Sequence, residues 1–271
     1  MLIGGMPAVV SAWVESGSLI DCSEAQQALL STYRDDFSKY APRIPPGRLA
    51  RVLDTVPRLL GRKFKYSLVD RDERSSALKH ALDLLCKARL CHRVVSTDGA
   101  GVPLAAGERR GYFKVVLLDT GMVCASLGVS LSELESPREA LFINEGGLAE
   151  QVVGQVLRTL GPRYKDARLF CWAREKKGSE AELDYLLQHG ARVVPVEVKA
   201  GSTGSLKSMH LFMSEKKLTR AIRINADMPS STSVAVTTTT GQRAQYQLLS
   251  LPFYLAEQAH RFLDDAFSPT G

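Results

Sequence analysis

The spacing of apolar positions predicts mainly helices over the first sixty residues. Residues 8–39 show helical periodicity in two pieces, and Ser23, followed by acidic residues, is suited to the start of the second piece. We therefore expect a small helical hairpin. The proline-rich segment 41–47 interrupts the pattern and predicts the boundary of the next unit. Apolar residues then recur at the spacing of an amphipathic helix, at Leu49, Val52, Leu53, Val56 and Leu60.

Residues 63–121 predict a second unit in which helix and strand alternate. The segment 63–69, KFKYSLV, alternates as a short strand does, and Ser75 begins a helix with one apolar face. Residues 90–95 and 112–121 predict two more strands, separated by a turn-prone stretch. Helix, strand, helix and a two-stranded hairpin is the order of a winged helix. Winged helices bind DNA and also dock other proteins, and the sequence leaves both uses open.

A change to polar, breaker-rich sequence over 135–142 predicts a domain boundary, after which strands and helices interleave. This pattern predicts an α/β (α+β) fold with a mixed central sheet flanked by helices. The predicted domains are a helical segment at 1–44, a winged-helix-like domain at 45–138 and a mixed-sheet domain at 139–271. Helices are expected at 147–161, 205–217 and 246–266, and strands at 169–172, 182–187, 193–199, 220–225 and 233–240.

Composition adds that the chain can form a soluble globular protein. Its 271 residues are 45% hydrophobic, which is enough for a packed core. No apolar run approaches the roughly 20 residues that cross a bilayer, and the first residues lack the features of a signal peptide. We therefore expect no membrane partner and a cytoplasmic location. Five scattered cysteines predict reduced, mostly buried thiols. The Cys91–His92 pair is not expected to bind zinc, because it lacks the other ligands that zinc requires.

Positive charge is concentrated in one segment. Residues 41–93 contain 13 Lys and Arg against 5 Asp and Glu, a net +8, whereas the whole chain carries +6. A local basic surface favours a polyanion such as nucleic acid. Arg74, Lys79, Lys87 and Arg89, on the second helix of this segment, are therefore candidates for contacts with DNA. A solvated outer helix face explains the same residues, and both interpretations stay open.

Three charged residues, Asp184, Glu197 and Lys199, stand among segments that otherwise have the pattern of buried strands. A hairpin with a two-residue turn at 189–190 would place Asp184 opposite Pro195 and all three charged side chains on one face. A turn longer by one residue would put Asp184 on the other face from Glu197 and Lys199. The predicted site therefore depends on the register.

The carboxylates of Asp184 and Glu197 predict a Mg²⁺ or Mn²⁺ site, because like charges held together repel without a cation. Lys199 is placed to stabilise a charged phosphate or to help activate water, and phosphodiester hydrolysis needs these parts. The alternative is a set of exposed charges at strand ends that form a weak salt bridge. Glu150 is a further candidate ligand, although a carboxylate early in its helix also interacts favourably with the helix dipole.

Several short pieces of the chain occur in a specific order. They are GGMP (4–7), YRDDFSKY (33–40), KFKYS (63–67), YFKVVLLDTG (112–121), GGLAEQ (146–151), WAR (172–174), GSEAELDY (178–185) and PVEVKAG (195–201). The helix with a glutamate, followed by Asp and ExK on adjacent strands, resembles the PD-(D/E)xK nuclease superfamily. More narrowly, the chain is similar to the C-terminal portion of a family of predicted prokaryotic AAA+ ATPases that ends in a domain of unknown function.

This resemblance implies a winged helix followed by a nuclease-like domain at 139–271. It also implies that Glu150, Asp184 and Glu197 are metal ligands and that Lys199 is the catalytic lysine. The family has a P-loop ATPase ahead of these parts, yet G-x-x-x-x-G-K-[ST] occurs nowhere in the sequence. We therefore expect no ATPase activity from this chain, and an ATPase module on a missing part of a longer protein or on other subunits. The sequence leaves open whether the chain is a fragment or a short member.

Residues just before the predicted site are expected to support the core or to contact phosphate. Trp172 is expected to support the core. Arg174, Lys176 and Lys177 are candidate phosphate contacts, and a solvated loop is the alternative. The leading hypothesis is metal-dependent hydrolysis of DNA phosphodiesters, with the winged helix binding the substrate. The alternative is a non-catalytic DNA-binding or protein-interaction module that regulates a linked ATPase, since a fold does not determine its chemistry.

Overall fold

The computed structural model divides into two compact units, each discontinuous in sequence. Unit 1 contains Met1–Arg93 and Lys114–Gln155, and unit 2 contains Val94–Phe113 and Val156–Gly271. These units cut across the three ranges expected from the sequence, and the ranges stay a prediction. The residues that the structure describes are 3–40, 44–130, 132, 146–162, 164–176, 179–201 and 204–265.

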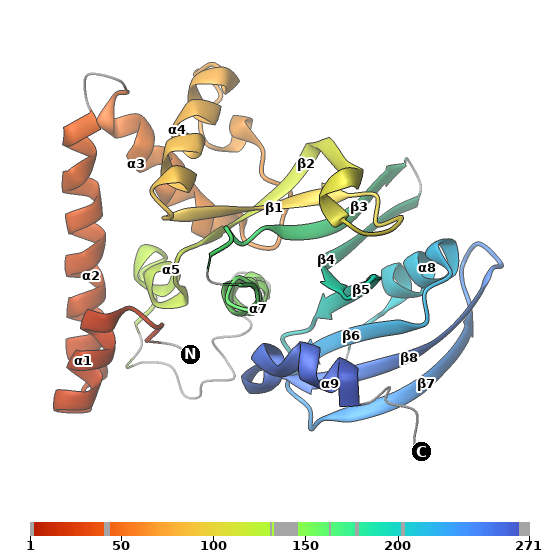
Figure 1. The fold of residues 1–271 in the computed structure, drawn as a ribbon. Coiled ribbons are helices and arrows are strands. Elements are labelled where there is room, and N and C mark those ends of the chain that lie inside the picture. The colour runs from red at the N-terminus through yellow and green to blue at the C-terminus, as the bar shows by residue number, and fades with distance from the viewer. Residues whose placement is uncertain are drawn as a thin grey trace. The chain divides into compact units, whose positions relative to one another are not determined.

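Unit 1 begins with the predicted helical hairpin. Helix α1 packs along α2 (Figure 1), and the Cys22 thiol lies 3.8 Å from the Val9 carbonyl. The second helix starts earlier than predicted, because Ser18 is its N-cap and accepts a hydrogen bond from the Asp21 amide. The hydroxyl of Ser23, the predicted start, instead donates to the Leu19 carbonyl inside the helix. The helices assigned to unit 1 are α1 (Pro7–Ser16), α2 (Leu19–Asp36), α3 (Pro46–Thr55), α4 (Ser75–Lys87), α5 (Thr120–Ser126) and most of α7 (Gly147–Leu157).

The segment 63–69 is not the strand that its alternation predicted. It contains the short 3₁₀ helix Tyr66–Leu68, whose turn is closed by a hydrogen bond from the Leu68 amide to the Lys65 carbonyl. Phe64 is buried at 3% exposure and anchors the segment. A single buried aromatic residue between exposed neighbours gives the same alternation as a strand. The pattern therefore showed which side chain is buried but not the backbone conformation.

Helix α5 was not predicted, and Asp119 is the residue that starts it. The Asp119 carboxylate accepts hydrogen bonds from the Gly121 and Met122 amides at 2.8 and 3.3 Å, so it is the N-cap. It also accepts from the Gly5 amide at 2.7 Å and from the Gln155 side chain at 3.0 Å. Asp119 is 2% exposed. One buried carboxylate therefore joins the N-terminal segment, α5 and α7.

Two glutamines attach helix α7 to the end of β2 (Glu108–Leu117) and to the start of α5. The Gln151 side chain is fully buried, accepts from the Leu117 amide at 2.8 Å and donates to the Leu117 carbonyl at 2.9 Å. Gln155 accepts from the Thr120 amide at 2.9 Å. The pieces GGMP, LLDTG and GGLAEQ thus meet in one hydrogen-bonded network, which gives these sequence pieces a structural role.

The described strands form one eight-stranded sheet in the order β2-β1-β3-β4-β5-β6-β8-β7 (Figure 1). Pairs β1–β3, β5–β6 and β6–β8 are parallel, whereas β3–β4, β4–β5 and β7–β8 are antiparallel. This mixed sheet with helices confirms the predicted α+β fold class. The remaining strands and helices are β1 (Cys91–Thr97), β3 (Leu169–Lys176), β4 (Ser179–His189), β5 (Arg192–Val198), β6 (Arg220–Asn225), β7 (Ser230–Thr237), β8 (Arg243–Pro252), α8 (Lys207–Lys216) and α9 (Ala259–Asp265).

The closing helix predicted over 246–266 is wrong in its first part. Residues 243–252 form β8, which pairs with β6 on one side and β7 on the other. Pro252 ends this strand, and a proline in a helix interior removes a hydrogen bond and clashes with the preceding turn. Only Ala259–Asp265 is α-helical. The second half of β8 is almost wholly buried, and a short buried run cannot be told from a buried helix by periodicity alone.

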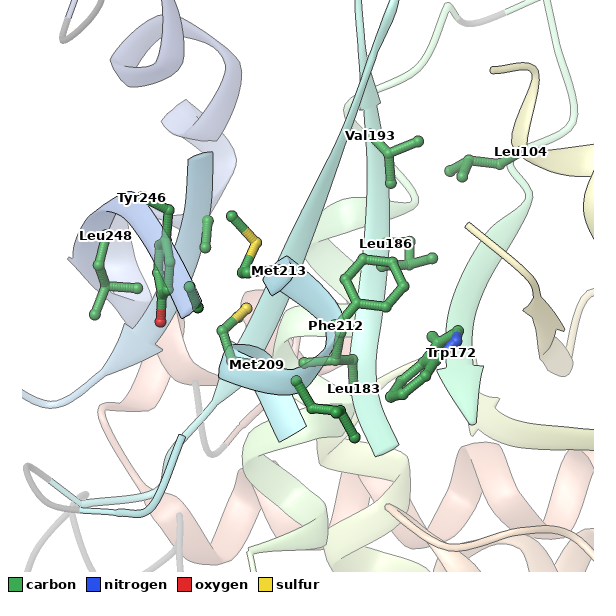
Figure 2. Close-up of a cluster of buried hydrophobic side chains, with 13 residues drawn as sticks. Leu104, Trp172, Leu183, Leu186, Val193, Met209, Phe212, Met213, Tyr246 and Leu248 are labelled. Carbon is green, nitrogen blue, oxygen red and sulfur yellow. The ribbon is translucent and has the colours of Figure 1, made fainter. Parts of the chain in front are cut away.

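The core of unit 2 lies between the sheet and α8. Figure 2 shows Phe212 of α8 directed toward Leu186 and Trp172, and the Trp172 and Phe212 rings lie 5.0 Å apart. Trp172 is 3% exposed, which confirms its predicted packing role. Gly99 approaches the same cluster with φ +62, and a Cβ there would lie 2.6 Å from the Phe212 ring. This position therefore requires glycine.

The five cysteines are free, as predicted, and four of them are buried. Burial, with a smaller effect from the nearby Asp119 carboxylate, raises the pKa of Cys124 to about 11. Burial likewise raises the pKa of Cys91 well above its ordinary value. Thiols with raised pKa values are poorly nucleophilic near neutral pH, so these two are structural.

His210 of α8 makes the stability of unit 2 depend on pH. Its Nδ1 lies 2.9 Å from the Tyr246 hydroxyl, and burial lowers its pKa below the ordinary value. The unfolded chain therefore binds a proton at this ring more readily than the folded chain does. We expect the free energy of unfolding to fall as the pH drops below about 6.5. Urea denaturation at about pH 7.5 and about pH 5.5 measures this loss of unfolding free energy. The loss should be smaller in His210→Gln. An equal loss in the parent and in His210→Gln would show that His210 is not its cause.

Candidate functional site

The β4–β5 hairpin carries the predicted site, and its turn differs from the prediction. Leu186 pairs with Pro195, and His189 pairs with Arg192, so the turn is at 190–191 rather than 189–190. Gly190 has φ +58, and a type II′ turn needs a positive φ at its first central residue. The register is therefore shifted by two residues from the prediction. A shift of two leaves every side chain on the side that was predicted.

Asp184 and Glu197 lie on neighbouring strands, where the ladder of β4 and β5 ends. The last pair of the ladder before this point joins Tyr185 and Val196, and one further step in the same register puts Asp184 opposite Glu197. The Asp184 carboxylate accepts a hydrogen bond from the Val198 amide at 2.8 Å. A side-chain oxygen thus bonds to an amide of the neighbouring strand, next to Glu197.

A bulge in β4 accompanies this change. Phe170 of β3 pairs with Leu186, and Trp172 pairs with Leu183, so two steps along β3 correspond to three along β4. The extra residue lies beside Asp184. Bulges bend a strand locally and re-aim its side chains, and they are frequent next to active sites. The predicted pairing of β4 with β5 gave no indication of this bulge.

Lys199 completes the cluster within unit 2. Its ammonium group donates to the Glu197 carboxylate at 2.7 Å, and its amide donates to the Ile224 carbonyl of β6 at 2.8 Å. The Lys199 side chain is 24% exposed and that of Glu197 is 9% exposed. A Cβ on Gly204 would lie 2.7 Å from the Lys199 stem, so the backbone at Gly204 passes close to this side chain. The structure therefore holds Lys199 beside Glu197, and the catalytic role of Lys199 stays a prediction.

Glu150 lies in α7, within unit 1, where it forms an ion pair with Lys114. The Lys114 ammonium group lies 2.8 Å from the Glu150 carboxylate, and the two side chains are 3% and 18% exposed. Gly61 passes over the carboxylate, so that a Cβ there would lie 2.8 Å from it. A buried ammonium group needs an opposite charge, which gives Glu150 a structural role. Its convergence with Asp184 and Glu197 stays a prediction.

The donor set at the hairpin suits a hard divalent cation. Among the described residues, no group of three or more His, Cys, Asp or Glu side chains is arranged to hold a metal ion. Mg²⁺, however, commonly uses one or two protein carboxylates and completes its octahedron with water and substrate phosphates. Asp184 and Glu197 are 9% and 7% exposed, and both supply carboxylate oxygens. These two residues fit the predicted Mg²⁺ or Mn²⁺, with Lys199 beside them.

The residues predicted to contact nucleic acid differ in their exposure and in their ion-pair partners. Arg74 and Lys79 lie at the start and on the outer face of α4, and both are exposed. Arg174 pairs with Glu215 of α8. Lys177 lies outside the described residues. The structure thus exposes the α4 cations, whereas Arg174 already has a carboxylate partner.

One hydrogen-bonded pair of side chains at the hairpin was not predictable from the sequence. The Tyr112 hydroxyl donates to the Glu182 carboxylate, and both residues belong to unit 2. The Ser208 hydroxyl of α8 accepts from the Glu182 amide at 3.3 Å. Glu182 lies two residues from Asp184, but its partners come from β2 and α8. Contacts between segments so distant in sequence could be found only from the fold.

Comparison with known families gives two separate matches. Residues 1–133 match a family described as "Domain of unknown function (DUF8612)", and residues 145–254 match one described as "Domain of unknown function (DUF4143)". The chain carries two domains of unknown function. The second match contains Glu150, Asp184, Glu197 and Lys199, and the first contains α4. No curated protein and no solved structure matches the chain.

A membrane-spanning helix was not expected from the composition. In the part of the chain that the structure describes, no helix combines the length and the apolar character that crossing a bilayer requires.

Proposed function

We propose that the chain is a cytoplasmic, metal-dependent nuclease-like protein that acts on DNA phosphodiesters and works with an AAA+ ATPase. The observation that supports this proposal is that, at the end of the β4–β5 ladder, Asp184 accepts from the Val198 amide and Lys199 pairs with Glu197. Support for the ATPase partner comes from the DUF4143 match, because this domain is typically found with AAA ATPase domains. The chain itself would not hydrolyse ATP, since it has no P-loop sequence.

The two carboxylates and the ammonium group suit hydrolysis of a phosphodiester. Asp184 and Glu197 would hold Mg²⁺ or Mn²⁺, which supplies Lewis acidity and lowers the pKa of a bound water. Lys199 would release its ion pair with Glu197 and stabilise the charge that develops on the phosphate. The Val198 amide holds Asp184 in place while this happens, because its hydrogen bond fixes the carboxylate.

The exposed cations of α4 supply the proposed DNA contact, as in a winged helix. Most carboxylates of the basic segment are already paired with arginines, as in Arg48–Glu73 and Arg93–Asp83. Among the described residues, Arg74, Lys79 and Lys87 have no carboxylate at ion-pair distance. The positive charges of these three residues are therefore not neutralised by a described carboxylate. Phosphate contacts of this type weaken as salt concentration rises.

Replacing Lys199 tests the catalytic proposal. In Lys199→Met the side chain keeps its length and its apolar stem but loses the ammonium group. We expect cleavage of linear duplex DNA in Mg²⁺ or Mn²⁺ to fall about a hundredfold, the usual effect of removing one charge-stabilising donor. Lys207→Ala, which removes an exposed lysine of α8, should cleave like the parent. Gel assays with EDTA as the metal-free control measure this, using linear, circular and single-stranded substrates.

Equal cleavage by the parent and by Lys199→Met would contradict the proposal and identify a contaminating nuclease. A parent that binds DNA but cleaves none of these substrates would instead favour a non-catalytic module that regulates a linked ATPase. One observation favours that second candidate. The Lys199–Glu197 ion pair and the Asp184–Val198 hydrogen bond give these charged groups partners without a metal, as a scaffold would.

A further inference from the structure

A cavity lies at the turn end of the β4–β5 hairpin. It has a volume of about 290 Å³ and lies entirely within unit 2. Three segments surround it: the loop at 99–101, the hairpin turn with the start of β5, and the connection from α8 to β6. Strands rise about 3.3 Å per residue, so the five residues from Arg192 to Glu197 separate the cavity from the metal-site candidates by roughly 16 Å.

The lining of this cavity is strongly basic. Arg192, Lys217 and Arg220 all line it, together with the hydroxyl-bearing Thr219, and no acidic residue is part of the lining. Burial, and then the positive charge of Arg192, lower the pKa of Arg220, while Asp264 partly opposes this effect. The two like charges thus repel one another. A bound anion would relieve that repulsion.

The backbone around the cavity is held rigidly. Gly99 is fixed against the Phe212 ring, and the Ala100 amide donates to the Asp98 carboxylate at 2.9 Å. Lys217 is the C-cap of α8 and has the left-handed conformation, with φ +52. Glycine or asparagine usually occupies such a position, so a lysine there is strained. A strained residue with a charged side chain in a cavity is typical of a binding site.

We propose that this cavity binds the phosphate group of a small ligand carrying at least two negative charges. Three cationic residues line a space large enough for a pyrophosphate or nucleotide phosphate group, and a single carboxylate would neutralise only one of them. Arginines bind phosphate oxygens with two parallel hydrogen bonds, and Lys217 adds a point charge. The site is separate from the Asp184–Glu197–Lys199 cluster, so this proposal does not rest on nuclease activity.

Lys217→Gly is the most informative variant. It removes the ammonium group from the cavity and also relieves the left-handed backbone, so it should fold at least as stably as the parent. Isothermal titration calorimetry of the full chain with inorganic pyrophosphate should show one saturable site in the parent. We expect at least about tenfold weaker binding in Lys217→Gly and in Arg192→Ala, since each removes a charged contact with the anion. Lys216→Ala, whose side chain does not line the cavity, is the matched control.

The absence of saturable pyrophosphate binding to the parent would overturn the proposal. So would equal affinities for the parent and Lys217→Gly. If Lys217→Gly instead weakened binding of duplex DNA and left pyrophosphate binding unchanged, the cavity would belong to a nucleic-acid surface and the small-ligand proposal would be wrong. Thermal unfolding of each variant shows whether a loss of binding reflects a loss of folded protein.

Discussion

Asp119→Ala is expected to destabilise unit 1 by about 4 kcal/mol, because two buried and two partly buried hydrogen-bond donors lose one acceptor and α5 loses its N-cap. The donors are the amides of Gly5, Gly121 and Met122 and the side chain of Gln155. A Cβ on Gly4 would lie 2.0 Å from the Asp119 carboxylate, so the N-terminal backbone packs directly on this group. Urea denaturation followed by circular dichroism measures the change in the free energy of unfolding.

Two other variants test whether the hydrogen bonds of Asp119 account for the expected loss of stability. Asp36→Ala removes an exposed carboxylate that pairs with Lys39, and its effect should stay below about 1 kcal/mol. Asp119→Asn keeps one acceptor oxygen and should be intermediate. If Asp119→Ala and Asp36→Ala unfolded at the same urea concentration, Asp119 would not be the residue that joins the three segments.

Asp184→Asn is expected to reduce DNA cleavage about a thousandfold, since losing a metal ligand removes several kcal/mol of transition-state stabilisation. The introduced asparagine side chain would still offer an oxygen to the Val198 amide, so the fold should be kept. Asp98→Asn is the matched control, because its carboxylate also accepts a backbone amide in unit 2, from Ala100. It should cleave like the parent. Loss of cleavage accompanied by unfolding, or no loss at all, would contradict the proposed role of Asp184.

Much of the hairpin was predictable because strand side chains alternate with a period of two. The turn was placed one residue early, yet this register keeps Asp184 and Glu197 on the predicted faces, since a shift of two preserves them. Gly190 was the signal for the correct turn, because a type II′ turn places glycine at its first central position. The β4 bulge had no such signal, since it depends on how β3 pairs with β4.

The errors elsewhere came from tertiary contacts. Residues 243–252 are a strand because β6 and β7 pair with them on both sides, and the mostly buried second half of this strand has no distinctive periodicity. The helix after Asp119 was missed because its N-cap lies at the end of an apolar run that predicts a strand. The Glu150–Lys114 pair was also beyond sequence reasoning, because 36 positions separate the partners. Local pattern predicts which residues are buried better than it predicts which distant residues meet.

Titration of Mn²⁺, followed by electron paramagnetic resonance, tests the metal site most directly. The parent should bind one tightly held Mn²⁺ per chain in the presence of a cleavage-resistant phosphorothioate duplex, which supplies the phosphate oxygens. In Asp184→Asn and in Glu197→Gln the affinity should fall at least about a hundredfold, and in Asp98→Asn it should not change. Identical titration curves for the parent and Asp184→Asn would show that these carboxylates do not hold a divalent cation.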